Sequence, residues 1–111
     1  MKLPNSENAV VDIRKLRDYC LDPSHPKGRH KARVFSAALG LGREVAEELQ
    51  GVLLSAARSA DAVAAAEGDE YGQRYVLDFE MRTRAGSAVI RSAWMIRSGE
   101  DFPRLSSCYV I

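Results

Sequence analysis

Hydrophobic residues recur at intervals of three and four positions through the first half of the chain, which is the spacing of amphipathic helices. A first helix is expected to begin at Asp12, a favourable N-cap, and to end before Pro23 and Pro26. Its apolar face comprises Ile13, Leu16 and Cys20, with Tyr19 beside them. The position of Cys20 on this stripe favours a buried and unreactive thiol.

Two further helices are expected downstream. The second begins in the basic segment 25–33, which places Arg29, His30 and Lys31 in or beside its first turn, and it ends at Gly40. The third is expected over residues 43–58, with glutamates in its first turn that complement the helix dipole. The flanking segments lack this period. Residues 1–11 indicate an extended arm that could pair as an edge strand at 9–11, and residues 61–68 indicate a frayed helix end or a loop.

From residue 75 onward apolar and polar residues alternate, which is the period of a half-buried strand. The alternation covers residues 75–82 and 88–97, with a turn signal at Ala85–Gly86, and a last strand is expected over 105–111. Helices first and consecutive strands afterwards indicate an α+β fold. We expect about three N-terminal helices packed on one face of a three- to four-stranded antiparallel meander sheet, with Trp94 in the sheet core.

Composition places the chain among ordinary folded domains. It has 111 residues, of which 46% are hydrophobic and 28% charged, so we expect one domain over residues 1–111. No apolar run is long enough to cross a membrane, and the N-terminus lacks the apolar core of a signal peptide. The two cysteines, Cys20 and Cys108, have no metal-ligand spacing. We therefore expect a reduced, cytoplasmic protein with no metal, no cofactor and no membrane partner.

Charge is distributed unevenly along the chain. Residues 1–43 carry nine Lys and Arg against four Asp and Glu, whereas residues 44–80 carry two against nine. The densest basic segment, 25–33, holds four cations, both histidines of the chain and no acid. A nearly neutral total charge therefore leaves room for an anionic ligand, because the local field is what concentrates it.

The basic segment offers groups for cleaving RNA by internal attack of the 2′-hydroxyl. That reaction needs a base, an acid and cations around the phosphorus, and histidine, present here as His25 and His30, is the residue type most often used for both proton transfers. Four cations in the segment are candidates for binding phosphate: Lys27, Arg29, Lys31 and Arg33. The alternative interpretation is an exposed, solvated basic turn in which His30 makes only local contacts.

A second group of candidates lies on the expected sheet. Arg91 and Arg97 share one strand face, and Ser106 or Ser107 with Tyr109 lie on the last strand. Arginine, serine and tyrosine side chains suit a phosphoryl-transfer site that works without a metal. In the alternative interpretation, the two arginines pair across strands with Asp78 and Glu80.

Nearly the whole chain resembles a bacterial family of uncharacterised domains. The resemblance is carried by Leu3–Asn5, Tyr19, His25–Pro26, Gly28, His30–Phe35, Asp78–Glu80, Arg91–Trp94, Gly99–Pro103 and Tyr109–Val110. Members of that family occur as stand-alone small proteins and as C-terminal modules of larger toxin-like or phage-associated proteins. The stand-alone form is often encoded beside a second small, β-rich protein.

The order of elements is also similar to that of the barnase–EndoU–colicin–RelE group of ribonuclease toxins. Within that resemblance, His30 and Lys31 match a motif at a helix start, and Ser106 or Ser107 with Tyr109 match a motif on the terminal strand. It implies a metal-independent ribonuclease of a toxin–antitoxin or polymorphic toxin system. Together with the basic segment, this makes His30, His25, Lys31, Ser107 and Tyr109 the expected catalytic residues, and Lys27, Arg29, Arg33 and Arg91 the expected phosphate-binding residues.

The chain departs from that group in having Ser106-Ser107-Cys108 before the tyrosine, where threonine is commoner, and in having no proline after it. This departure keeps a second hypothesis open, a non-catalytic module that binds RNA or a neighbouring small protein. RNA and a small β-rich cognate protein, antitoxin-like or immunity-like, are the expected partners. The edge strands of a small meander also leave a dimer or a heterocomplex open.

Overall fold

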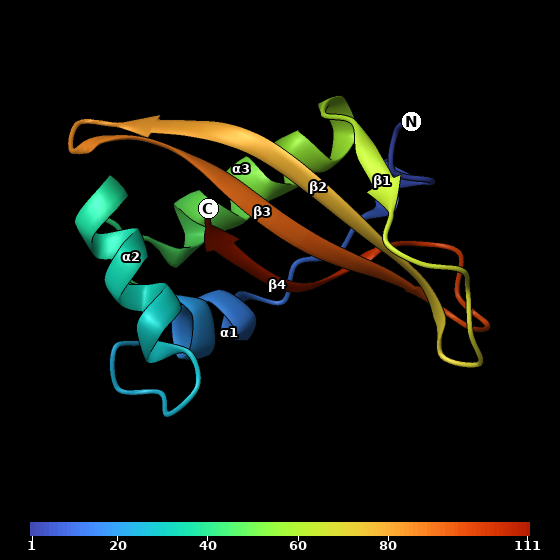
Figure 1. Cartoon of the computed structure of the whole chain (residues 1–111), viewed down its shortest axis with the longest axis horizontal. Coiled ribbons are helices and arrows are strands. Elements are labelled where there is room, and N and C mark those ends of the chain that lie inside the picture. The colour runs from blue at the N-terminus through green and yellow to red at the C-terminus, as the bar shows by residue number, and fades with distance from the viewer.

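The computed structural model describes residues 1–111 as helical elements followed by a sheet (Figure 1). The helical elements are η1 (Ser6–Asn8), α1 (Ile13–Lys15), η2 (Leu16–Cys20), α2 (Arg29–Leu39), η3 (Arg43–Val45) and α3 (Ala46–Ser59). The strands are β1 (Ala62–Ala64), β2 (Gly72–Thr83), β3 (Gly86–Arg97) and β4 (Arg104–Val110). None of the helices is both long enough and apolar enough to cross a membrane.

The four strands form one antiparallel sheet in the order β1-β2-β3-β4, which confirms the expected α+β meander. Helix α3 runs behind β2 and β3, and α1 and α2 gather at the β4 side (Figure 1). The β2–β3 turn lies at the C-terminal end of α2, where the Thr83 hydroxyl donates to the Leu39 carbonyl at 2.8 Å. Gly40 ends α2 in the left-handed conformation, as its position in the sequence indicates.

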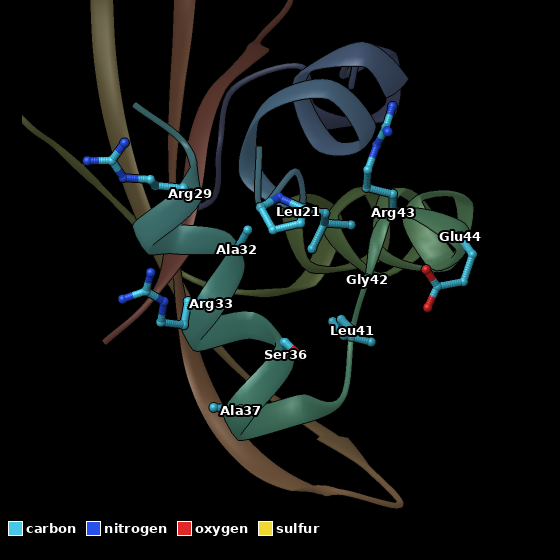
Figure 2. A pocket seen from close by; sticks show the side chains of 11 residues that line it. Leu21, Arg29, Ala32, Arg33, Ser36, Ala37, Leu41, Gly42, Arg43 and Glu44 are labelled. Carbon is cyan, nitrogen blue, oxygen red and sulfur yellow. The ribbon is translucent and has the colours of Figure 1, made fainter. Parts of the chain in front are cut away.

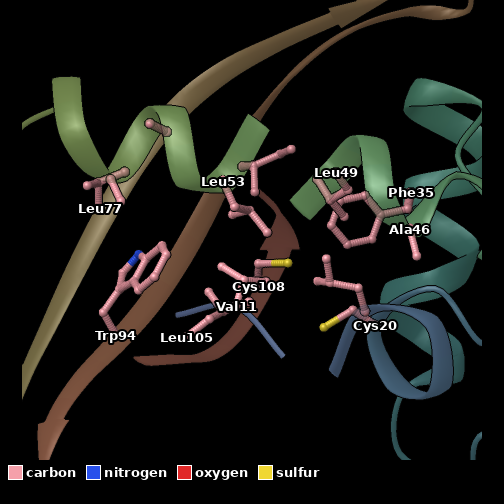
Figure 3. Packing of buried hydrophobic residues seen from close by; sticks show 14 of the residues in the cluster. Val11, Cys20, Phe35, Ala46, Leu49, Leu53, Leu77, Trp94, Leu105 and Cys108 are labelled. Carbon is pink, nitrogen blue, oxygen red and sulfur yellow. The ribbon is translucent and has the colours of Figure 1, made fainter. Parts of the chain in front are cut away.

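The hydrophobic core lies between the helices and one face of the sheet (Figure 3). Phe35 of α2 and Leu49 and Leu53 of α3 are buried against the sheet residues Leu77, Ile90, Trp94, Leu105 and Cys108. Trp94 is fully buried, as expected, and its indole N–H donates to the Ser92 hydroxyl at 2.9 Å. Ser92 donates in turn to the Leu77 carbonyl, so the one buried polar side chain of the core is satisfied.

The first helix begins as expected but continues in a different geometry. The Asp12 carboxylate caps it by accepting from the Arg14 amide at 3.0 Å. After one short α turn the chain widens into a π-helical turn, η2, closed by the Leu21 amide and the Leu16 carbonyl. This turn buries Leu16, Cys20 and Leu21 together and leaves Tyr19 half-buried at the side. Such wide turns often occur at functional sites.

Two flanking segments differ from the simplest interpretation of the sequence. The N-terminal arm pairs with β4 through a single parallel bridge between Val10 and Arg104, so it adds no strand of its own. Residues 61–68 contain β1, whereas the alanine content indicated a frayed helix end or a loop. Val63 pairs with Val76 and Ala62 is buried, so pairing with β2 overrides the helix propensity of alanine here.

Strand β4 contains a β-bulge at Ser106. Ser107 lies opposite Ala93, whereas Leu105 lies opposite the next residue of β3, Trp94, so Ser106 is the extra residue. The bulge explains why Leu105 and Cys108, three positions apart, are both buried. It also brings Tyr109 opposite Arg91.

Candidate functional site

The basic segment folds into a turn followed by the start of α2, as the sequence indicates. His25 Nδ1 accepts hydrogen bonds from the backbone amides of Lys27 and Gly28, at 3.0 and 2.9 Å. The His25 carbonyl accepts from the Arg29 amide, the first residue of α2. With Nδ1 occupied as an acceptor, the proton of the neutral imidazole is on Nε2. The His25 side chain therefore closes the turn that precedes α2, whereas the N-cap residue of α2 itself, Gly28, makes no side-chain capping hydrogen bond.

Lys31 of α2 lies at the centre of a polar cluster. Its ammonium donates to the Tyr19 hydroxyl at 2.9 Å and lies 5.0 Å from the centroid of the Tyr19 ring. It also lies 6.0 Å from the centroid of the Tyr109 ring on β4. The Tyr19 hydroxyl raises the pKa of Lys31 above its usual value, which keeps the ammonium charged. A fixed positive charge thus lies between two tyrosines from different elements.

His25 and Tyr19 border a shallow hollow on one side of this cluster. Their rings meet edge to face with centroids 4.9 Å apart. The hollow has a volume of about 490 Å³, and the remaining residues that line it are Asp12, Arg14, Lys15, Ser106 and Ser107. One histidine, one tyrosine and the two serines of the terminal strand therefore face the same space.

His30 lies beside a second hollow, of about 330 Å³, lined also by Lys31, Val34, Tyr109 and Val110. The two histidines of the basic segment therefore do not share a hollow. They are connected through the hydrogen bond between Lys31 and Tyr19, since Tyr19 lines the first hollow and Lys31 lines the second. Lys31 lines only the second hollow, so His30 shares a hollow with this cation and His25 does not.

Arg91 of β3 neighbours the cluster only through Tyr109, and it lines a separate hollow with Asp78 and β1. It lies opposite Tyr109 in the strand register and binds the Asp78 carboxylate through two hydrogen bonds, each of 2.9 Å. The Asp78 carboxylate, and to a smaller extent the Tyr109 hydroxyl, raise the pKa of Arg91 further above its usual value. The cross-strand pairing weighed as an alternative is present for Arg91. It is absent for Arg97, which lies opposite Gly72, and for Glu80, which pairs with Arg82.

Arg29 and Arg33 are not part of this cluster. They lie four residues apart on the opposite flank of α2 from Lys31, and neither forms an ion pair. They border a larger hollow of about 550 Å³ whose floor includes the buried Leu21 and Leu41. Figure 2 shows both guanidinium groups directed away from Arg43 and Glu44 at the other rim. Lys27 is exposed in the turn before α2.

Sequence reasoning placed Tyr19 beside the apolar face of the first helix but did not include it in the site. The sequence feature that could have identified Tyr19 is its position next to the apolar face of this helix, where a side chain is half-buried. The π-helical turn that aims it at Lys31 has no recognisable sequence pattern. No group of three or more His, Cys, Asp and Glu side chains is arranged to hold a metal ion.

The fold and this cluster define a small α+β domain with a lysine–tyrosine centre at the edge of its sheet. A family model described as a domain of unknown function (DUF6883) matches residues 2–111. Because the match spans nearly the whole chain, the chain belongs to this family. No curated protein and no solved structure matches the chain significantly.

Proposed function

We propose that this chain cleaves RNA without a metal ion, by internal attack of the 2′-hydroxyl, as the toxin-like component of a bacterial toxin–antitoxin or polymorphic toxin system. The observation that carries the proposal is the Lys31 ammonium held between Tyr19 and Tyr109, with a histidine-lined hollow beside each tyrosine. A phosphate on Lys31 would lie in the hollow that His30 borders, with the Tyr19 hydroxyl on the ammonium and His25 behind Tyr19. The weaker resemblance to ribonuclease toxins supports the same reaction.

In this proposal the phosphate binds at Lys31, with Arg91 and the Tyr109 hydroxyl orienting its non-bridging oxygens and Ser107 contributing from the first hollow. His30 takes the proton of the attacking 2′-hydroxyl. The bond from O2′ to phosphorus forms as the bond to O5′ breaks. Lys31 and Arg91 stabilise the extra negative charge of the transition state.

The leaving O5′ needs a proton, and two groups of the first hollow carry one. The Tyr19 hydroxyl accepts from Lys31, which leaves its own proton free to be donated outward. The second possible donor is Nε2 of His25, because Nδ1 of this ring accepts hydrogen bonds from the Lys27 and Gly28 amides. We assign the proton transfer to Tyr19 and give His25 a positioning role, since its cap and its ring contact hold Tyr19.

The test is incubation of the purified chain with mixed-sequence RNA in excess chelator. Wild type is expected to produce fragments with 2′,3′-cyclic phosphate ends. His30→Ala and Tyr19→Phe should each slow cleavage by about 10²-fold or more, the usual contribution of a proton-transfer residue. Tyr71→Phe, at an exposed tyrosine outside the cluster, is the matched control and should cleave normally.

A further variant separates the two proton donors. His25→Asn replaces the ring by a side chain that caps helices well but transfers no proton. Retained cleavage in His25→Asn supports Tyr19 as donor. Because this substitution also removes the ring contact with Tyr19, loss of cleavage in the folded variant assigns the step to His25 only if Tyr19→Phe still cleaves. A folded wild type that leaves RNA intact, or a His30→Ala variant as fast as wild type, would contradict the proposal.

One observation favours the second candidate, a non-catalytic module that binds RNA or a small β-rich cognate protein. The Arg91 guanidinium is already bound in two places by Asp78, which reduces its capacity to grip a phosphate. Filter binding against salt tests this candidate. RNA binding that weakens steeply with salt, without cleavage, indicates an RNA-binding module. A complex with the neighbouring gene product that is insensitive to salt indicates a protein-binding module.

A further inference from the structure

The first hollow contains an unpaired cation. Lys15, the last residue of α1, lines this hollow, and its ammonium forms no ion pair with any carboxylate of the chain. The ammonium donates one long hydrogen bond, of 3.4 Å, to the carbonyl of Ser106 at the bulge of β4. This bond connects α1 to β4 and leaves the positive charge without a counterion.

The one carboxylate that lines the hollow is already neutralised. Asp12 accepts hydrogen bonds from the backbone amide of Arg14 at 3.0 Å and from its guanidinium at 3.1 and 2.8 Å, so both carboxylate oxygens are occupied. Arg14 lines the same hollow, and the ion pair therefore adds no net charge to it. With a neutral His25, the hollow carries the single positive charge of Lys15.

The remaining polar side chains of the hollow offer hydrogen-bond donors. The Tyr19 hydroxyl accepts from Lys31, and Nδ1 of His25 accepts from two backbone amides, so each group keeps a proton for an outside acceptor. The Ser107 hydroxyl is buried and has no hydrogen-bond partner in the fold, although Ser107 lines the hollow. A buried hydroxyl without a partner is costly, and a ligand oxygen at the inner wall of the hollow would satisfy it.

This set of groups selects an anion with several oxygens. An unpaired ammonium, surrounded by donors and with no free carboxylate beside it, matches the charge and the acceptor atoms of a phosphate group. A cationic ligand would meet the charge of Lys15, and an apolar ligand would leave these donors unsatisfied. The chemistry of the hollow therefore favours phosphate.

We propose that the first hollow is a second phosphate-binding site, in which Lys15 and Ser107 hold the 3′-phosphate of the nucleotide that leaves when RNA is cleaved. The choice of this phosphate rests on the proposed function. There the scissile phosphate lies on Lys31 and the leaving O5′ lies at the Tyr19 hydroxyl, which borders the first hollow. The 3′-phosphate of that same nucleotide is the next anion along the RNA.

The test compares two dinucleotides that differ only in a 3′-terminal phosphate. Both carry a 2′-deoxy sugar at the first nucleotide, which removes the attacking hydroxyl, so neither can be cleaved and binding is measured directly by calorimetry. The unmodified chain should bind the 3′-phosphorylated dinucleotide about three- to tenfold more tightly, as expected for charge-assisted hydrogen bonds at a partly exposed site.

Variants assign this difference to the hollow. Lys15→Ala should remove most of the advantage of the 3′-phosphate, and Lys15→Arg should keep it because the charge is retained. Ser107→Ala should reduce the advantage in part. Lys2→Ala is the matched control, since Lys2 is an exposed lysine that pairs with Asp61 away from the hollow, and it should leave the advantage unchanged. Circular dichroism checks that each variant is folded.

Three results would overturn the inference: equal affinity for the two dinucleotides, an advantage that survives in Lys15→Ala, or an equal loss in Lys2→Ala. Inorganic phosphate serves as a separate arm. If it bound as tightly as the 3′-phosphorylated dinucleotide, the assignment of the hollow to a phosphate of RNA would be wrong.

Failure of this inference is distinguishable from failure of the proposed function. A preference for the 3′-phosphate that depends on Lys15, in a chain that leaves RNA intact, keeps the phosphate site and removes the cleavage reaction. Cleavage without that preference does the reverse. In a chain that cleaves, Lys15→Ala should raise KM and leave kcat nearly unchanged, because the charge of the 3′-phosphate does not change during the reaction.

Discussion

Gly28 packs directly on the backbone of Tyr19. A methyl group at Gly28 would overlap the Tyr19 carbonyl oxygen and would lie 3.0 Å from an edge carbon of the Tyr19 ring. This close approach brings the first turn of α2 against the last turn of η2, and it sets the distance that the Lys31 ammonium spans to the Tyr19 hydroxyl. The cluster therefore requires glycine at position 28, because any side chain there would push α2 away from Tyr19.

The first prediction follows from this contact. Gly28→Ala should lower the free energy of unfolding by about 1–3 kcal/mol, the usual cost of overpacking, because a backbone carbonyl cannot yield as a flexible side chain does. Gly51→Ala in the middle of α3 is the matched control, since nothing lies within 4 Å of a methyl group there. It should raise stability by about 0.5–1 kcal/mol through helix propensity. If Gly28→Ala and Gly51→Ala changed the free energy of unfolding in urea by the same amount, the packing argument would be contradicted.

The turn that His25 closes before α2 gives a second prediction. His25→Ala removes the acceptor of the Lys27 and Gly28 amides and should cost about 1 kcal/mol in unfolding free energy. His25→Asn should recover most of that loss, because asparagine is among the best N-caps. The measurement is chemical denaturation of the three proteins side by side. A full loss in both variants would show that the ring contact with Tyr19, rather than the cap, holds the turn.

The lowered pKa of Cys20 predicts a specific pH dependence of stability. A thiol with an ordinary pKa of 9.0 when unfolded, and about 7 when folded, stabilises the fold above pH 9, and this contribution is lost as the pH falls through 7. Between these values the free energy of unfolding should rise by about 1–3 kcal/mol. Above the ordinary thiol pKa, Cys108 opposes the trend, since its own pKa is raised in the fold.

Urea titrations under reducing conditions at several pH values would measure this rise. Cys20→Ser lacks the thiolate and should show a flat profile over the same range. A flat profile in the unmodified chain would mean that Cys20 remains a neutral thiol in the fold.

The two flanks of α2 lead to a fourth prediction, which rests on the proposed function. Lys31→Ala should abolish most RNA cleavage, because it removes the central cation. Arg29→Ala and Arg33→Ala lie on the other flank and should leave the cleavage rate at saturating RNA nearly unchanged. They should instead weaken RNA binding and reduce its salt dependence by about one ion per arginine removed. A loss of turnover in either arginine variant would show that the scissile phosphate binds on the flank of Arg29 and Arg33, and would contradict its placement at Lys31.

The architecture could be predicted from the sequence because it rests on periodicity. Residues 29–39, 46–59 and the long hairpin of β2 and β3 carry strong helical or alternating patterns, and the structure has them close to the expected positions. Strand β1 could not be predicted in this way. Its short alanine-rich sequence favours a helix, and only pairing with Tyr75–Leu77, far along the chain, makes it a strand.

The cluster was predictable in part. The basic segment and the terminal strand identified Lys31 and Tyr109, which the structure brings within 6.0 Å of each other. The sequence could not show that Arg29 and Arg33 face away from them, or that His25 and His30 border different hollows. Those relationships depend on the rotation of α2 about its axis, which local pattern alone does not determine. The contact of Tyr19 with Lys31 depends on the π-helical turn, which local pattern does not predict.

The extra residue in β4 has no partner on β3. Because Leu105 lies opposite Trp94 and Ser107 lies opposite Ala93, removing Ser106 would make these two pairs consecutive and would turn β4 into a regular strand. Cys108 would stay opposite Ser92 and Tyr109 opposite Arg91, so neither residue would change face. Ser106 is exposed, so replacing its side chain should also matter little. Natural variation at this position should therefore include deletion as well as substitution.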